Sequence, residues 1–267
     1  MFTKFLAFIK RDFLIMISYK LHFILQLFGM FAHIVIFYFI STLIQDGNSR
    51  YLQQYGGNYF SFVLIGIAFS GYLTTALHSF ASNIRQEQMM GTLEAMLTTP
   101  TKLWVIIIFS SLWNFIFASI SVVLYLVFGS LLGIDLSAAN FSGALVVLIL
   151  TIIVFSSIGI IASSFIMVFK KGDPIAALIS LTSSVLGGVF FPIAVLPKSV
   201  QFFSHLIPIT YSLRALRLAI LKGYSIDYFF SDILVLLLFI VVLFPIGLLL
   251  FKFAVKKAKI DGSLTHY

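Results

Sequence analysis

The sequence lacks cysteine altogether, and charged residues make up only 10% of its 267 positions. Without a thiol the chain forms no disulfide, and it offers neither a thiolate nucleophile nor a cysteine-based metal site. A soluble domain carries about 25% charged residues, which coat its apolar core. This chain has too few polar side chains to cover a large core in that way, so much of its apolar surface must face lipid.

Hydrophobic residues make up 61% of the chain, and they gather in long unbroken runs. A helix needs about 20 apolar residues to cross the hydrocarbon layer, whereas barrel strands are short and alternate in polarity. The runs therefore predict an all-α integral membrane protein that forms one domain over residues 1–267. Six spans are predicted, at 21–44, 58–82, 103–132, 141–169, 174–196 and 231–251.

Motifs for catalysis and energy conversion are also missing. No GxxxxGK[ST] run is present to cradle a nucleotide, and no HExxH or similar spacing indicates a metal site. None of the nine acidic residues lies near the middle of a predicted span. Carriers that are driven by protons or sodium usually keep a charged group at membrane depth. If this chain moves something uphill, a partner is expected to supply the energy.

Lysine and arginine are unevenly distributed between the predicted loops. With the N-terminus inside, twelve of the 17 lie on the cytoplasmic side and five on the outer side. For a multi-pass protein of the plasma (inner) membrane, the positive-inside rule then predicts that both termini and the basic tail 252–267 lie in the cytoplasm. This sorting explains the net charge of +8 without nucleic acid as a partner. Four of the five outer cations lie in 197–230, which is the weak point of the assignment.

Residues 1–20 are predicted to form an amphipathic helix that lies on the membrane surface. At ~100° per residue, the large apolar side chains up to Ile17 share one face, and Lys4, Lys10 and Arg11 share the other. Basic residues on the polar face favour contact with anionic lipid. The alternative is an ordinary cytoplasmic extension of the first span.

The loop 83–102 after the second span contains residues that typically begin and end a short helix. Gly91 can end a helix that runs in from the span, and Thr92 can cap a new one. Glu94 suits the positive end of the new helix dipole, and Pro100 stops the helix. Its apolar side chains share one side: Leu93, Met96 and Leu97. Apolar residues on a cytoplasmic turn favour a protein partner, and a plain helical connector is the alternative.

The linker 197–230 before the last span is long and half-apolar. It follows Pro192 and Pro197, and the stretches 199–206 and 210–221 can each form a helix too short to cross the bilayer. We expect these helices to dip into the outer leaflet and return.

Arg214 and Arg217 lie three residues apart in this linker and therefore on one helix face. One interpretation is that they anchor the outer interface to lipid phosphates. The alternative is that they handle a polar headgroup of a transported molecule.

Taken in order, these features resemble the type-2 permeases of ATP-binding cassette exporters. The most specific part is the run Gly91-Thr92-Leu93-Glu94 with the following Pro100, which is closest to the drug- and nodulation-factor-exporter branches. The second part is the segment before the last span, with Phe191-Pro192, Leu196-Pro197, Pro208-Ile209-Thr210-Tyr211, Arg214 and Arg217. The similarity covers nearly the whole chain, mostly through hydropathy.

The resemblance implies a transmembrane subunit of an ATP-driven exporter for a drug, lipid, glycolipid or polysaccharide. Two copies of the chain, or this chain and a close relative, would sit in membrane lipid on two cytoplasmic ATPase subunits. ATP and magnesium would bind to those partners, and this chain would hold no cofactor, metal or catalytic residue.

The resemblance also assigns roles to residues. Contact with the ATPase falls to Arg85, Glu87, Gly91, Thr92, Leu93, Glu94, Met96, Leu97 and Pro100. The interfacial helix with Lys4, Lys10 and Arg11 adds a second contact, through Lys10 and Arg11. An outer gate is implied at Pro192, Pro197, Pro208, Tyr211, Arg214 and Arg217.

Two other functions stay open on the residues alone. A stand-alone secondary carrier would need a polar relay, for which His33, Asn114, Ser156 and Ser157 are the candidates. An integral membrane enzyme acting on lipids would need a set of acids and bases at one interface, and the outer side offers His205, Asp227 and Asp232.

Overall fold

The computed structural model describes residues 9–11, 13, 14, 18, 20–44, 50–89, 103–169 and 173–260, and these residues form helices and turns without a strand. Five of the helices are long and apolar enough to cross a membrane. They are α2 (Lys20–Ile44), α3 (Tyr59–Met89), α5 (Leu103–Leu131), α6 (Phe141–Phe169) and α10 (Phe230–Ile260). The predicted all-helical membrane fold is thereby confirmed.

Six shorter elements complete the described chain. The α-helices are α7 (Asp173–Leu186), α8 (Lys198–Ser204) and α9 (Pro208–Lys222), and the 3-10 helices are η1 (Gln53–Tyr55), η2 (Ile193–Val195) and η3 (Ile226–Phe229). The two short helices that the sequence predicts at 199–206 and 210–221 correspond to α8 and α9.

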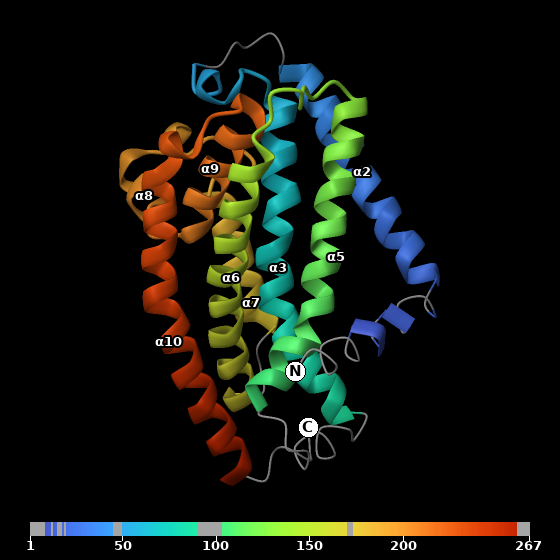
Figure 1. Ribbon diagram of the computed structural model, residues 1–267, viewed down its shortest axis with the longest axis vertical. Coiled ribbons are helices and arrows are strands. Elements are labelled where there is room, and N and C mark those ends of the chain that lie inside the picture. Colours follow the sequence, from blue (N-terminus) through green and yellow to red (C-terminus); the bar gives the residue numbers. More distant parts are fainter. Residues whose placement is uncertain are drawn as a thin grey trace.

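The long helices run side by side, with α3 in the middle of the bundle (Figure 1). Helix α3 packs against α5 and α6, and α6 packs in turn against α10. Helices α3, α6 and α10 end, and α5 begins, at the same end of the bundle, whereas η1, α8 and α9 lie at the other end and α2 begins about halfway along the bundle (Figure 1). We refer to the two ends as the α3–α5 end and the α9 end.

The segment 174–196, predicted as one span, is a short helix followed by turns. Helix α7 stops at Leu186, because the backbone N–H of Gly187 closes the last turn on the Ser183 carbonyl and Gly188 takes a left-handed φ of 76°. Two prolines beyond this point donate no backbone hydrogen bond. A helix of 14 residues reaches only ~21 Å at ~1.5 Å per residue, short of the ~30 Å hydrocarbon core.

The last long helix extends further than the sequence predicts. Helix α10 continues from Phe230 to Ile260 through Pro245, so the first part of the predicted basic tail is helical. The exposed side chains of Lys252, Lys256 and Lys257 follow the apolar part of this helix. The rest of the tail, 261–267, lies outside the described residues.

Candidate functional site: an arginine-lined pocket at the α9 end

Helix α9 carries the two arginines and has clear signals at both of its ends. Pro208 occupies the first turn, where its missing N–H removes no helical hydrogen bond. At the other end Gly223 takes a left-handed φ of 65°, and its N–H donates to the Leu218 carbonyl. Most of the helix is buried against α6, α10 and α3.

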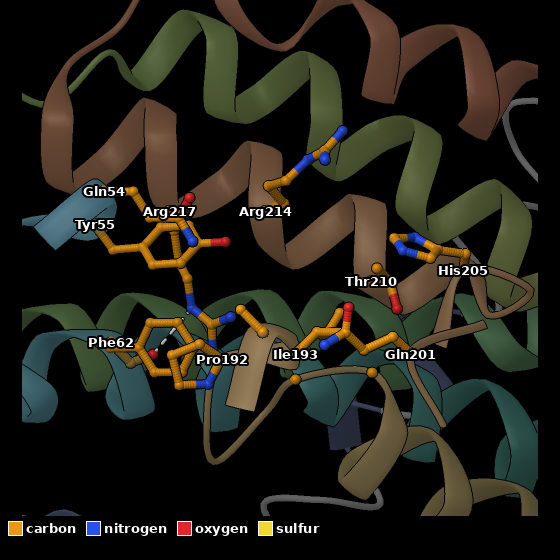
Figure 2. A pocket seen from close by; sticks show the side chains of 13 residues that line it. Gln54, Tyr55, Phe62, Pro192, Ile193, Gln201, His205, Thr210, Arg214 and Arg217 are labelled. Atoms are coloured by element: carbon orange, nitrogen blue, oxygen red, sulfur yellow. Dashed lines mark hydrogen bonds between the residues drawn. The ribbon is translucent and has the colours of Figure 1, made fainter. Parts of the chain in front are cut away.

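Arg217 points into the protein and is only 3% exposed. Its Nε donates to the Phe62 carbonyl and its Nη2 donates to the Val189 carbonyl, both over 3.1 Å. The guanidinium carbon lies 3.4 Å from the centroid of the Phe62 ring and 5.8 Å from that of Tyr55 (Figure 2). Arg217 therefore ties α9 to α3 and to the turn after α7. The lipid-anchor interpretation is wrong for this residue, because a buried guanidinium does not reach the membrane surface.

Gly66 on α3 makes this close approach possible. A Cβ atom at position 66 would lie 2.2 Å from the Val189 carbonyl oxygen and 2.6 Å from Nη2 of Arg217. Real Cβ atoms do not approach other atoms so closely, so only glycine allows the turn and the arginine to sit against α3 together.

Arg214, one turn earlier on α9, reaches a different partner. Its Nε lies 2.9 Å from each carboxylate oxygen of Asp232, and its Nη2 also bonds to Oδ1. Asp232 belongs to the first turn of α10 and is 1% exposed, whereas the Arg214 side chain is 44% exposed. A two-nitrogen contact of this kind fixes the relative positions of α9 and α10.

The two helices before the last span are also joined to each other. The Thr210 hydroxyl donates to the Ser204 carbonyl over 2.7 Å, and the Tyr211 hydroxyl donates to the His205 carbonyl over 2.8 Å. Both bonds run from α9 back to the end of α8. Among the predicted gate residues, Pro192 and Pro208 are buried and Pro197 caps the start of α8 in the exposed surface.

A cavity of about 180 Å³ lies between η1, α3, the turn after α7, α8 and α9. Figure 2 shows its lining: Gln54, Tyr55, Phe62, Gly187, Gly188, Pro192, Ile193, Ala194, Gln201, His205, Thr210, Arg214 and Arg217. The structure thus brings together Pro192, Arg214 and Arg217 from the predicted gate. Sequence reasoning missed Tyr55 and Phe62, and it considered Asp232 only for an enzyme, because the actual contacts of these residues join distant segments.

The predicted site for the ATPase lies largely outside the described residues. This applies to Lys4 and to Gly91, Thr92, Leu93, Glu94, Met96, Leu97 and Pro100. Arg85 and Glu87 fall in the last turns of α3, where the backbone is helical. Lys10 and Arg11 are helical as well, the first exposed and the second half-buried.

Several residues that the two other functions would need make local or structural contacts. The His33 ring places Nδ1 2.8 Å from the Gly29 carbonyl of its own helix, and the Ser157 hydroxyl donates to Ile153 in the same way. Asp232 is engaged by Arg214, and Asp227 accepts from Ser225. No group of three or more metal-ligating side chains occurs within the described part of the chain.

A helical bundle with several membrane-length helices is typical of a multi-pass membrane protein. The chain belongs to the ABC-2 type transporter family, whose family model matches residues 3–221. The sequence-based family prediction is thereby confirmed.

Individual relatives agree with this assignment. Over 172 residues the chain is 26% identical to the inner membrane transport permease YadH of Escherichia coli, and the same values hold for YadH of Shigella flexneri. The alignment covers 63% of this chain and 66% of each relative, so the chain spans just under two thirds of the relatives' length. A multi-pass protein of the inner membrane fits both the relatives and the long apolar helices.

Proposed function

We propose that the chain is the transmembrane subunit of an ATP-driven exporter that moves a hydrophobic or amphiphilic molecule, such as a drug, lipid, glycolipid or polysaccharide. The observation that carries the proposal is the match of the ABC-2 family model to residues 3–221 of a chain with five membrane-length helices. Two cytoplasmic ATPase subunits would supply the energy, and a second copy or a close relative would complete the pore.

We also propose that the chain crosses the membrane six times. Helix α6 runs from the α9 end to the α3–α5 end, and α10 starts again at the α9 end (Figure 1). The chain between them must therefore return once, and α7 with its following turn covers that distance. Non-helical backbone is tolerated at membrane depth where protein covers it. In support, Arg217 binds the Val189 carbonyl, and Gly187 contacts Ile209 of α9.

The α3–α5 end would face the cytoplasm. The exposed side chains of Lys252, Lys256 and Lys257 belong to the last part of α10, which finishes at this end, as the positive-inside rule requires (Figure 1). Helix α3 ends and α5 begins here as well (Figure 1). The loop 90–102 that joins them is therefore attached on the side where a cytoplasmic ATPase would dock.

Single-cysteine labelling tests this orientation without background, because the natural chain has no cysteine. Thr92→Cys reports on the coupling loop, and Ser225→Cys reports on an exposed loop position at the α9 end. In intact spheroplasts, a membrane-impermeant maleimide should label Ser225→Cys at once and Thr92→Cys only after permeabilisation. The reverse pattern would reject both the orientation and the proposed docking of the ATPase.

A second experiment tests the coupling itself. The chain is reconstituted with its ATPase, and stimulation of ATP hydrolysis and substrate export are measured. Glu94→Arg should abolish both, because it reverses charge where the ATPase is proposed to bind. Asp135→Arg is the matched control, since Asp135 is an exposed acidic residue in the loop between α5 and α6 at the other end. Equal activity of the two variants would contradict the proposal.

A further inference from the structure

The pocket at the α9 end contains one more positive charge than the surrounding protein neutralises. Arg214 is matched by Asp232, so that pair adds no net charge. Arg217 forms no ion pair with any carboxylate in the described part of the chain, and no acidic residue lines the cavity. A buried charge is costly unless an opposite charge or several hydrogen bonds accompany it.

The contacts that Arg217 does make leave this charge in place. Its two backbone acceptors and the Phe62 ring are neutral groups, which satisfy donors without supplying a negative charge. Burial raises the pKa of the neighbouring Tyr55 phenol, so the phenol stays protonated beside the arginine. The Nη1 atom of Arg217 has no hydrogen bond to the described residues, although the side chain lines the cavity.

Two exposed polar side chains line the cavity from opposite sides. Gln54 of η1 lies on the side of Tyr55 and Arg217, and His205 after α8 lies on the far side, beyond Thr210 (Figure 2). Other polar groups of the lining are already engaged, since Thr210 donates to the Ser204 carbonyl and the amide nitrogen of Gln201 donates to the Leu196 carbonyl. Among the described residues, Gln54 and Nη1 of Arg217 therefore remain as donors without a protein acceptor on one side of the cavity.

The volume of the cavity limits what could enter it. Pockets that enclose a drug-sized molecule measure about 300–1,000 Å³. At about 180 Å³ the cavity is smaller than this range, so it would hold a compact group rather than an acyl chain or a whole drug. A phosphate or carboxylate is of suitable size, and planar guanidinium groups bind such oxyanions well.

We propose that this pocket is a binding site for a small oxyanion, either a free phosphate or the phosphate of an amphiphile headgroup, held by Arg217 with Gln54 on the same side of the cavity. The anion would supply the negative charge that the protein does not. The site does not depend on the proposed transport function, because binding requires neither an ATPase nor turnover.

A carboxylate introduced into the pocket by substitution tests the proposal. Gln54→Glu keeps the shape of the side chain but places a carboxylate in the pocket, where it would compete with a ligand. Gln53→Glu is the matched control, because Gln53 is an exposed neighbour in η1 with the same charge change and does not line the cavity. Binding of inorganic phosphate and of short-chain phosphatidylglycerol is measured by titration calorimetry on purified protein in a neutral detergent at constant ionic strength.

We expect saturable binding to the natural protein and to Gln53→Glu, with an affinity at least tenfold lower in Gln54→Glu. Saturation by phosphate alone identifies a free-anion site, and saturation by the lipid alone identifies a headgroup site. No saturation by either ligand in the natural protein would overturn the proposal, as would equal affinities in the two variants. If Gln54→Glu does not fold, His205→Glu introduces the same charge from the opposite side of the cavity. Its affinity should then also be at least tenfold lower than that of Gln53→Glu.

Discussion

Helices α3 and α10 are both long enough to span a membrane, but their surroundings are opposite. In the membrane-length part of α3, 72% of the residues are buried inside the protein, whereas the share in α10 is 17%. Nevertheless α10 is the more apolar of the two. In a soluble protein the more buried helix is usually the more apolar one, and here the order is reversed. The reason is that lipid accepts only apolar side chains, whereas the protein interior offers partners to polar ones.

Contacts along the two helices show how this difference arises. The Tyr72 hydroxyl of α3 is buried and donates to the Ser119 hydroxyl of α5 over 2.8 Å. Small residues such as Gly66 and Ala76 on α3 let neighbouring segments approach closely, which is the main source of packing between membrane helices. On α10, by contrast, Leu238 and Leu249 are more than 60% exposed and would face lipid.

The largest effect is expected where α10 departs from this pattern. Its first turn buries Asp232 against Arg214, so Arg214→Leu would leave a carboxylate uncompensated and should lower the free energy of unfolding by about 3 kcal/mol or more. Asp232→Asn leaves only a half-exposed guanidinium and should cost about 1 kcal/mol. SDS titration of both variants measures their free energies of unfolding. Equal losses of stability would show that the burial of Asp232 adds nothing to the cost of breaking the pair.

A matched pair of leucines tests the comparison directly. Leu77 on α3 is fully buried, whereas Leu238 on α10 is 62% exposed. Leu77→Ala should lower the free energy of unfolding by about 2–3 kcal/mol through the cavity that it leaves. Leu238→Ala should change it by less than about 0.5 kcal/mol, as is usual for surface substitutions. A larger loss for Leu238→Ala would mean that another chain covers this face of α10.

A matched pair of glycines compares a position that has no room for a Cβ atom with one where the fit is only tight. At Gly66 an added Cβ would meet the Val189 carbonyl at 2.2 Å, but at Gly247 of α10 its nearest neighbour is the Ser157 carbonyl at 3.2 Å. Gly66→Ala should therefore cost about 1–3 kcal/mol by overpacking, with a smaller change for Gly247→Ala. Thermal unfolding in a neutral detergent should therefore show a lower melting temperature for Gly66→Ala than for Gly247→Ala. Similar melting temperatures for the two variants would contradict this expectation.

The smallest effect is expected for the polar contact inside the bundle. Tyr72→Phe removes the hydrogen bond to Ser119 and should lower the free energy of unfolding by about 0.6 kcal/mol, a typical value between membrane helices. A double-mutant cycle with Ser119→Ala isolates this interaction. A coupling energy near zero would show that burial of the ring, rather than the hydrogen bond, holds Tyr72 in place.

Much of this architecture could be predicted from local patterns. The apolar runs at 58–82, 141–169 and 231–251 correspond to α3, α6 and α10, and the proline and glycine signals around 208–223 bound α9. The segment 174–196 was less predictable. Its mean apolar character favours a span, but the paired glycines after Leu186 and the prolines that follow end the helix early.

The pocket was only partly predictable. The spacing of Arg214 and Arg217 placed both on one helix face, but it did not show that one would turn inward and the other would meet α10. Their partners, Phe62 and Asp232, are 155 and 18 residues away in the sequence. Pairing over such distances depends on which helices become neighbours, and no local pattern carries that information.

The sequence by itself determined that this chain is a membrane protein, which of its segments form long apolar helices, and to which family it belongs. The first two follow from apolar length in a local window, because the hydrocarbon core selects for it. The family follows from short runs of particular residues. Only the tertiary structure decided that α3 would be the central helix and that the buried Arg217 would have no carboxylate partner among the described residues. Burial and charge pairing are properties of neighbours in space, and they are fixed when the helices pack.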